Sequence, residues 1–255
     1  MLETKCAGPT ASTLAVREIR CRAALTRSRI PGIDYALNPY VGCAHGCRYC
    51  YAEFMRGYTG HAEAWGSFVD VRINAAQQLA NHVARLRPGV IGLSTVTDPY
   101  QPLERKYQLT RSCLAVLRAC LFPVSILTKS PLVRRDIDVL RSLAECEVGL
   151  TVTTDDERMR RLFEPCAPPL VRRLEALAAL KAAGLRTYAF VGPALPMNPQ
   201  HLAKLLEGLV DEVLVDRMNY VHKVASLYRA HGLTKFLSDS YFEEVEAALS
   251  AVAKR

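Results

Sequence analysis

Three cysteines lie close together in the segment GCAHGCRYCYAE, residues 42–53. Cys43, Cys47 and Cys50 follow the spacing C-x3-C-x2-C, and glycine and polar residues stand between them. Cysteines that pack as small hydrophobic groups belong in apolar surroundings, which this loop does not offer. Because the thiolate form of cysteine is a metal ligand, the spacing indicates a metal site.

The number of thiols bears on the kind of metal. Structural zinc takes four protein ligands, usually from two separated pairs, and no second pair accompanies these cysteines. His45 lies inside the same turn, where ligation would strain the loop, so a solvated histidine is the simpler interpretation. A cubane iron–sulfur cluster takes four thiolates, one per iron. Three cysteines therefore leave one iron open to a ligand from outside the protein.

Composition limits the class of protein. The chain has 255 residues, is 50% hydrophobic and contains nine cysteines, and its formal net charge is +8. We expect a cytoplasmic protein with no membrane association, because the sequence shows neither an apolar run of about 18 residues nor a signal peptide. Thiols stay reduced in that compartment, which argues against a disulfide framework. The positive charge favours anionic partners such as nucleic acids or nucleotides.

Short β-rich runs alternate with segments of helical periodicity along the chain. The six strand-like runs are residues 35–41, 90–96, 124–129, 148–154, 186–192 and 212–218. Helices are expected at 74–86 and 109–121, from a capping box at Thr154 and Glu157 to Phe163, between Pro169 and Gly184, from Pro199, and from Ser238 or Asp239.

Strands that alternate with helices predict a parallel sheet, either open and doubly wound or closed as an incomplete barrel. In both architectures the functional site lies at the carboxyl ends of the strands. We expect a single α/β domain over residues 34–255, including C-terminal helices, preceded by a basic N-terminal extension over residues 1–33.

The cysteine motif resembles the signature of radical S-adenosylmethionine (SAM) enzymes. Further segments are similar to the spore photoproduct lyase-like branch, whose members are often labelled DNA repair photolyases: STVTDPYQPLERKYQLTR, LTKSPLVRRDIDVL, VGLTVTT, LFEPCAPPLVRRLEALAALKAAGL and FVGPALP. The resemblance implies a partial (β/α)6 TIM-like barrel. It also implies a [4Fe–4S] cluster, reductive cleavage of SAM to a 5'-deoxyadenosyl radical, and an electron donor such as flavodoxin or ferredoxin.

The resemblance implies roles for several residues beside the metal ligands. Thr97 matches a partner of the SAM amino group, and Lys129 matches a partner of its carboxylate. Thr151 and Thr153 match contacts to the ribose, although threonine is also an ordinary strand residue. Tyr49 matches a residue that flanks the adenine, mostly through its backbone.

Other residues have less definite implied roles. Asp98 and Glu164 match positions that orient SAM or substrate, but Asp98 precedes a proline and could equally build a turn. Arg173 is a candidate SAM or substrate contact. Tyr49 and Tyr51 match the tyrosines that assist hydrogen transfer, with Tyr51 as the catalytic candidate, and Cys166 is the one remaining cysteine that merits a test as a reactive thiol.

The sequence departs from spore photoproduct lyase at one position. The lyase has a hydrogen-donating cysteine three residues before the aspartate that matches Asp98, and this chain has Thr95 there. A hydroxyl O–H bond is too strong to replace that donor. We therefore expect a radical SAM enzyme whose substrate is unidentified, with a nucleic acid or a nucleotide as the candidates. The alternatives are transfer of a SAM-derived alkyl or sulfur group to a small metabolite, or a non-catalytic metal-containing module that binds nucleic acid.

Overall fold

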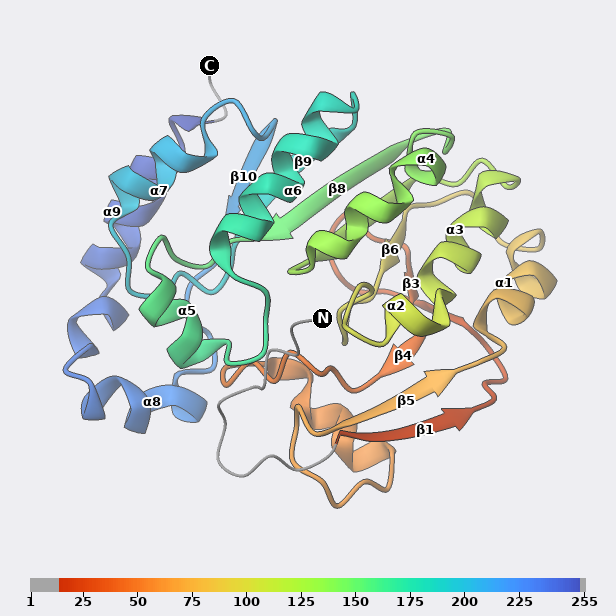
Figure 1. Ribbon diagram of the computed structural model, residues 1–255, viewed down its shortest axis with the longest axis horizontal. Coiled ribbons are helices and arrows are strands. Elements are labelled where there is room, and N and C mark those ends of the chain that lie inside the picture. Colours follow the sequence, from red (N-terminus) through yellow and green to blue (C-terminus); the bar gives the residue numbers. More distant parts are fainter. Residues whose placement is uncertain (1–13, 253–255) are drawn as a thin grey trace.

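The computed structural model describes residues 14–252. A seven-stranded sheet forms the centre of the fold, as Figure 1 shows for the strands that it labels. The strand order is β10-β9-β8-β7-β6-β3-β2, and every neighbouring pair is parallel except the pair β2 and β3. The bounds are β2 (Leu25–Arg27), β3 (Tyr35–Leu37), β6 (Ile91–Leu93), β7 (Val124–Thr128), β8 (Cys146–Thr151), β9 (Arg186–Val191) and β10 (Glu212–Val215). The predicted α/β partial barrel is confirmed.

The first predicted strand, residues 35–41, is two strands in the structure. β3 pairs with β6 in the large sheet, whereas β4 (Tyr40–Val41) pairs antiparallel with β5 (Phe68–Arg72). Pro39 lies between them, and a proline has no N–H to donate to a continuous ladder. Its carbonyl instead accepts a hydrogen bond from the Arg72 N–H, at 3.1 Å.

A small second sheet has the order β1-β5-β4, and sequence analysis did not predict it. β1 (Ala15–Ile19) runs parallel to β5, with Ala15 opposite Phe68. Both β1 and β2 fall within residues 1–33, and the first 13 of those residues lie outside the described part of the chain. The division into an extension and a barrel domain stays a prediction.

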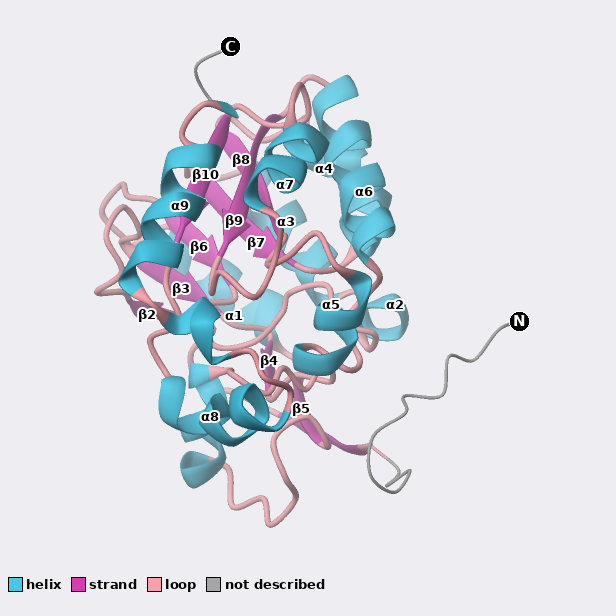
Figure 2. Cartoon of the chain, turned by 90° about the vertical axis from the view of Figure 1, so that its left-hand side faces the viewer, coloured by secondary structure: helices cyan, strands magenta, loops and turns pink. Residues whose placement is uncertain are grey.

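Helices connect the parallel strands. The α-helices are α1 (Ala75–Val83), α2 (Glu104–Tyr107), α3 (Leu109–Arg118), α4 (Ile137–Leu140), α5 (Glu157–Phe163), α6 (Leu170–Ala182), α7 (Pro199–Leu206), α8 (Val221–Ala230) and α9 (Asp239–Leu249). The 3-10 helices are η1 (Tyr51–Tyr58), η2 (Pro131–Asp136) and η3 (Thr234–Leu237). Figure 2 shows strands β6 to β10 grouped in the upper part of the view and α8 at the lower end.

Most predicted helix ends are confirmed. The Ser238 side chain caps α9, and Gly184 follows α6 in the left-handed region, with φ of 77°. The predicted capping box at Thr154 is wrong, because Asp156 caps α5 by accepting the Arg158 N–H. The Thr154 hydroxyl instead donates to the Pro196 carbonyl at 2.7 Å.

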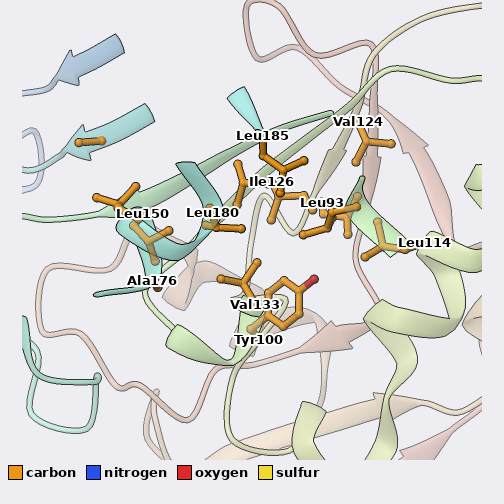
Figure 3. Close-up of a cluster of buried hydrophobic side chains, with 14 of the residues drawn as sticks. Leu93, Tyr100, Leu114, Val124, Ile126, Val133, Leu150, Ala176, Leu180 and Leu185 are labelled. Carbon is orange, nitrogen blue, oxygen red and sulfur yellow. The ribbon is translucent and has the colours of Figure 1, made fainter. Parts of the chain in front are cut away.

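The hydrophobic core lies between the large sheet and its outer helices (Figure 3). Leu93, Ile126 and Leu150 of three neighbouring strands pack with Leu114 of α3 and Leu180 of α6, and all five side chains are buried. Side chains alternate between the two faces of a strand. The strand residues that follow these core positions therefore face the inside of the barrel.

The inside of the barrel is filled at its lower part by Tyr188 of β9. The Tyr188 hydroxyl donates to the Ile126 carbonyl at 3.2 Å, and its ring lies over Gly149 of β8. A Cβ at residue 149 would clash with that ring, so this strand position requires glycine.

Within residues 14–252 no helix has the length and hydrophobicity needed to cross a bilayer.

Candidate active site

The three motif cysteines lie on a tight loop that follows β4. The loop turns twice, with the Gly46 N–H donating to the Cys43 carbonyl at 3.3 Å and the Cys50 N–H donating to the Cys47 carbonyl at 3.1 Å. Gly42 has φ of 83°, and a Cβ there would clash with the carbonyl of Phe68. Glycine is therefore required where the chain enters the loop.

One cavity collects the cysteines and the carboxyl ends of the strands. All three sulfurs belong to residues that line it, and each parallel strand from β6 to β10 contributes at least one residue from its end or from the loop that follows. These contributions include Thr97, Lys129, Thr151, Gly192 and Asp216. The convergence is the one that parallel barrel strands produce.

The donor set fits a [4Fe–4S] cluster. Within residues 14–252, no three His, Cys, Asp or Glu side chains gather closely enough to enclose a single metal ion. A cubane binds each thiolate at a separate iron, so its ligands face a common space without meeting. Cys43, Cys47 and Cys50 are free cysteines that line the same cavity, which suits thiolates bound to separate irons of one cluster.

The Lys129 ammonium favours the Cys47 thiolate against the effect of burial. Burial raises the pKa of the Cys47 thiol to about 12, and the nearby Lys129 ammonium opposes that rise. For Lys129, burial alone would lower the pKa, but Cys47 and Glu164 outweigh it and the pKa is raised. Lys129 therefore stays a cation inside the cavity, with its Nζ 5.8 Å from the centre of the Tyr49 ring.

Asp98 joins the loops after β6 and β7. Its carboxylate accepts hydrogen bonds from the Tyr100 N–H at 2.8 Å, the Thr128 hydroxyl at 2.6 Å and the Lys129 N–H at 2.8 Å. Burial opposes ionisation of Asp98, but His45 and these donors outweigh it and lower the pKa to about 2. The carboxylate thus builds the turn and fixes the backbone of Lys129.

The prediction of a solvated His45 is wrong. The residue is 1% exposed, and its Nδ1 lies 3.4 Å from Asp98 Oδ2. The glycine-rich loop folds over the strand ends, so the imidazole lies beneath it rather than in solvent. His45 is a cavity-lining residue beside the cysteines.

Glu164 is the centre of a buried polar network behind the cavity wall. Its carboxylate accepts hydrogen bonds from the Tyr49 hydroxyl, from Arg173 and, at 3.0 Å, from the Thr153 hydroxyl. Lys129 Nζ lies 3.9 Å from the same carboxylate. Burial opposes ionisation of Glu164, but Arg173, Lys129 and the hydrogen bonds outweigh it and lower the pKa to about 2.

The structure places the predicted site residues at two depths. Tyr49, Tyr51, Thr97, Asp98, Lys129 and Thr151 line the cavity with the three cysteines. The described lining residues do not include Thr153, Glu164, Arg173 or Cys166. Arg173 reaches the wall indirectly, because its guanidinium donates to the Thr151 carbonyl at 2.9 Å. The Cys166 N–H donates to the His45 carbonyl at 3.3 Å, next to the cysteine loop.

Sequence analysis missed several residues of the cavity wall. Ser94 has φ of 62°, and its buried hydroxyl has no hydrogen-bond partner among the described residues. Trp65 lies before β5, and Met218, Asn219 and Tyr220 lie after β10. Asn219 and Tyr220 directly follow the last predicted strand and Met218 ends it, which was a usable signal for these three, whereas no short-range pattern marks Ser94 or Trp65.

Comparisons with known proteins agree with this geometry. The sequence model of the radical SAM superfamily matches residues 37–209. An uncharacterised protein of Methanocaldococcus jannaschii is 36% identical over 72% of this chain and 70% of its own length. An uncharacterised protein of Mycobacterium tuberculosis is 32% identical over 76% of this chain and 61% of its own.

The fold is similar to a solved structure of spore photoproduct lyase complexed with dinucleoside spore photoproduct. The TM-score is 0.62 at 17% identity, and the match covers 81% of this chain and 65% of that chain. This chain thus spans less than two thirds of the length of the mycobacterial protein and of the lyase. At such low identity the likeness to the lyase concerns the fold.

Proposed function

Because the chain belongs to the radical SAM superfamily, we propose that it binds a [4Fe–4S] cluster through Cys43, Cys47 and Cys50 and reductively cleaves SAM. When bound, the cluster supplies the electron that splits SAM into methionine and a 5'-deoxyadenosyl radical, which takes a hydrogen atom from a substrate. The convergence of the three thiols with Lys129 and Thr97 on one cavity carries the proposal. A donor such as flavodoxin or ferredoxin would provide the electron.

Residues at the strand ends suit the polar groups of SAM. We assign the SAM carboxylate to the Lys129 ammonium, because an ion pair compensates the burial of both charges. The Thr97 hydroxyl donates to the Gly42 carbonyl at 2.6 Å and accepts from the Gln101 side-chain amide at 3.1 Å, which leaves one lone pair of its oxygen as an acceptor for the SAM amino group. Thr151, the last residue of β8, is the ribose partner, and the Tyr49 backbone flanks the adenine.

Four further residues position that wall. Thr153, Glu164 and Arg173 hold Tyr49, Lys129 and Thr151 through the buried network, in place of the direct SAM contacts that the resemblance implied. Asp98 acts in the same way through the Lys129 N–H. We propose these four as positioning residues.

A row of aromatic side chains extends from the cavity to the surface. Tyr51 stacks with Tyr220 at a ring distance of 6.1 Å and with Phe54 at 6.4 Å, and Tyr58 packs edge-on against Phe54. Tyr51 and Tyr220 line the cavity, while Phe54 is 52% exposed and Tyr58 is 80% exposed. We call these four residues the aromatic shelf.

The aromatic shelf favours a substrate with a planar ring, and we propose a nucleobase in a nucleic acid or nucleotide. Exposed aromatic side chains stack on bases regardless of sequence, and the net charge of +8 suits a phosphate backbone. The structural neighbour complexed with a dinucleoside points to the same class of substrate. Tyr51 remains the candidate for hydrogen transfer, since Thr95 supplies no thiol at the place where the lyase has one, and Cys166 remains a thiol to be tested.

The test is product analysis of anaerobic, cluster-loaded protein with dithionite and SAM. We expect 5'-deoxyadenosine and methionine, formed faster with single-stranded or lesion-bearing DNA, or with nucleotides, than with buffer alone. Methylthioadenosine as the main product would show 3-amino-3-carboxypropyl transfer instead, which is the alternative with a small metabolite. If SAM stays intact although the cluster is reduced, the remaining interpretation is a non-catalytic metal-containing module that binds nucleic acid.

The same assay tests the aromatic shelf. Phe54→Ala should raise the KM for the stimulating oligonucleotide about tenfold, because stacking on one aromatic ring is worth roughly 1–3 kcal/mol per base. Val171→Ala is the matched control, since Val171 is a 58% exposed hydrophobic residue on α6 that does not line the cavity. Equal KM values for both variants would remove the shelf from the substrate site.

A further inference from the structure

The indole of Trp65 is a buried hydrogen-bond donor without a partner. Trp65 is the only tryptophan of the sequence, and it lines the cavity that holds the three cysteines. Its Nε1 is buried and makes no hydrogen bond within residues 14–252. An unsatisfied buried donor is destabilising and rare in native proteins, so its retention requires an explanation.

Cys50 lines the same cavity as Trp65 and is the thiol on which the indole acts. Burial raises the pKa of the Cys50 thiol, and the nearby Trp65 side chain is one of the groups that oppose this rise. The Ala52 N–H acts on the same sulfur. A neutral thiol is a weak acceptor, whereas a thiolate bound to iron carries the negative charge that strengthens such a bond.

The neighbouring chain holds the indole against the cysteine loop. The Trp65 ring packs edge-on against Phe68, with centroids 5.9 Å apart. Gly66 has φ of 97°, and a Cβ there would lie 2.7 Å from the Gly46 Cα, so the two backbones touch. The Ser67 N–H closes the turn by donating to the Ala64 carbonyl at 3.0 Å. The donor is therefore fixed before any ligand arrives.

We propose that the Trp65 indole N–H donates a hydrogen bond to the Cys50 sulfur of the loaded protein and thereby raises the reduction potential of the cluster. The inference rests on the proposed function, because it requires iron at Cys50. One-electron reduction places additional negative charge on the cluster sulfurs, and a donor stabilises the reduced state more than the oxidised state. Trp65 thus acts on the cluster through the Cys50 sulfur and is not one of the proposed SAM contacts.

The measurement is a redox titration of cluster-loaded protein, followed by electron paramagnetic resonance (EPR). Trp65→Phe keeps an aromatic ring against Phe68 but removes the N–H. We expect the equilibrium constant for one-electron reduction to fall about tenfold, which corresponds to a midpoint lower by about 59 mV. An unchanged midpoint in a variant with full iron content would overturn the inference.

A second substitution separates the N–H from ring packing. Because the chain has a single tryptophan, biosynthetic replacement by 3-benzothienylalanine changes only residue 65 and preserves the shape of the indole. The analogue should lower the midpoint as Trp65→Phe does, and it decides the question if Trp65→Phe fails to fold. In unsubstituted protein, the exchangeable indole proton should show hyperfine coupling to the reduced cluster, and its absence would contradict the hydrogen bond. Failure of the unsubstituted protein to load a cluster would instead overturn the proposed function.

Discussion

Cys47→Ala should abolish both the iron–sulfur absorbance and SAM cleavage. Cys47 is the central thiol of the motif, and it lies on the cavity wall beside Lys129. Loss of groups that merely support a metal ligand costs about 10–100-fold in metal affinity or activity. Loss of the ligand itself should therefore reduce deoxyadenosine formation to less than about one hundredth of the unsubstituted rate. Iron content and the visible spectrum after anaerobic reconstitution give the complementary measurement.

The control for Cys47→Ala is Cys120→Ala. Cys120 is a half-buried cysteine near the end of α3, and its thiol donates to the Val116 carbonyl at 3.4 Å. That variant should bind the same amount of iron as the unsubstituted protein and cleave SAM at a similar rate. A Cys47→Ala protein that kept a four-iron cluster and cleaved SAM normally would show that the motif thiols are not the ligands.

Glu164→Gln should give the largest loss of stability among single substitutions near the site. The change leaves the fully buried Arg173 cation without its carboxylate partner. Removing one member of a buried ion pair costs about 3–5 kcal/mol, which corresponds to a melting temperature lower by roughly 10 °C for a domain of this size. Glu175→Gln is the matched control, because Glu175 pairs with Arg172 on the surface, where an ion pair contributes at most about 1 kcal/mol.

The Glu164 network also predicts a dependence of stability on pH. The pKa values of Glu164 and Asp98 are both lowered to about 2 in the folded protein, below the ordinary range of unfolded carboxyl groups. Such groups stabilise the fold above their unfolded pKa, and this contribution is lost as pH falls from about 4.5 towards 2. In Glu164→Gln, the free energy of unfolding from denaturant titrations should fall less steeply over that pH range than in the unsubstituted protein. Equal slopes for both proteins would contradict the role of Glu164.

Sequence reasoning succeeded where the signal was local. The cysteine spacing identified the loop, and the position of Thr97, Lys129 and Thr151 at predicted strand ends brought them to one cavity. This works because the carboxyl ends of parallel strands converge in any barrel of this kind. The predicted strand runs therefore gave the architecture and the site together.

Sequence reasoning failed where distant segments decide the structure. The small sheet joins Ala15 to Phe68, and no local pattern announces that pairing. The polar, glycine-rich surroundings of His45 suggested exposure, but the imidazole is buried beside the Asp98 carboxylate of the loop after β6. The resemblance implied that Glu164 and Arg173 contact or orient SAM or substrate, and sequence alone did not predict their burial behind the cavity, which depends on the complete fold.

The proposal that one iron of the cluster is open to SAM can be tested most directly by electron–nuclear double resonance on the reduced, cluster-loaded protein with isotopically labelled SAM. The account predicts hyperfine coupling of the cluster to 17O in the SAM carboxylate and to 15N in its amino group. Both couplings should weaken in Lys129→Met, which removes the proposed partner of the carboxylate. A cluster that shows neither coupling in the unsubstituted protein, because four protein ligands complete it, would contradict the account.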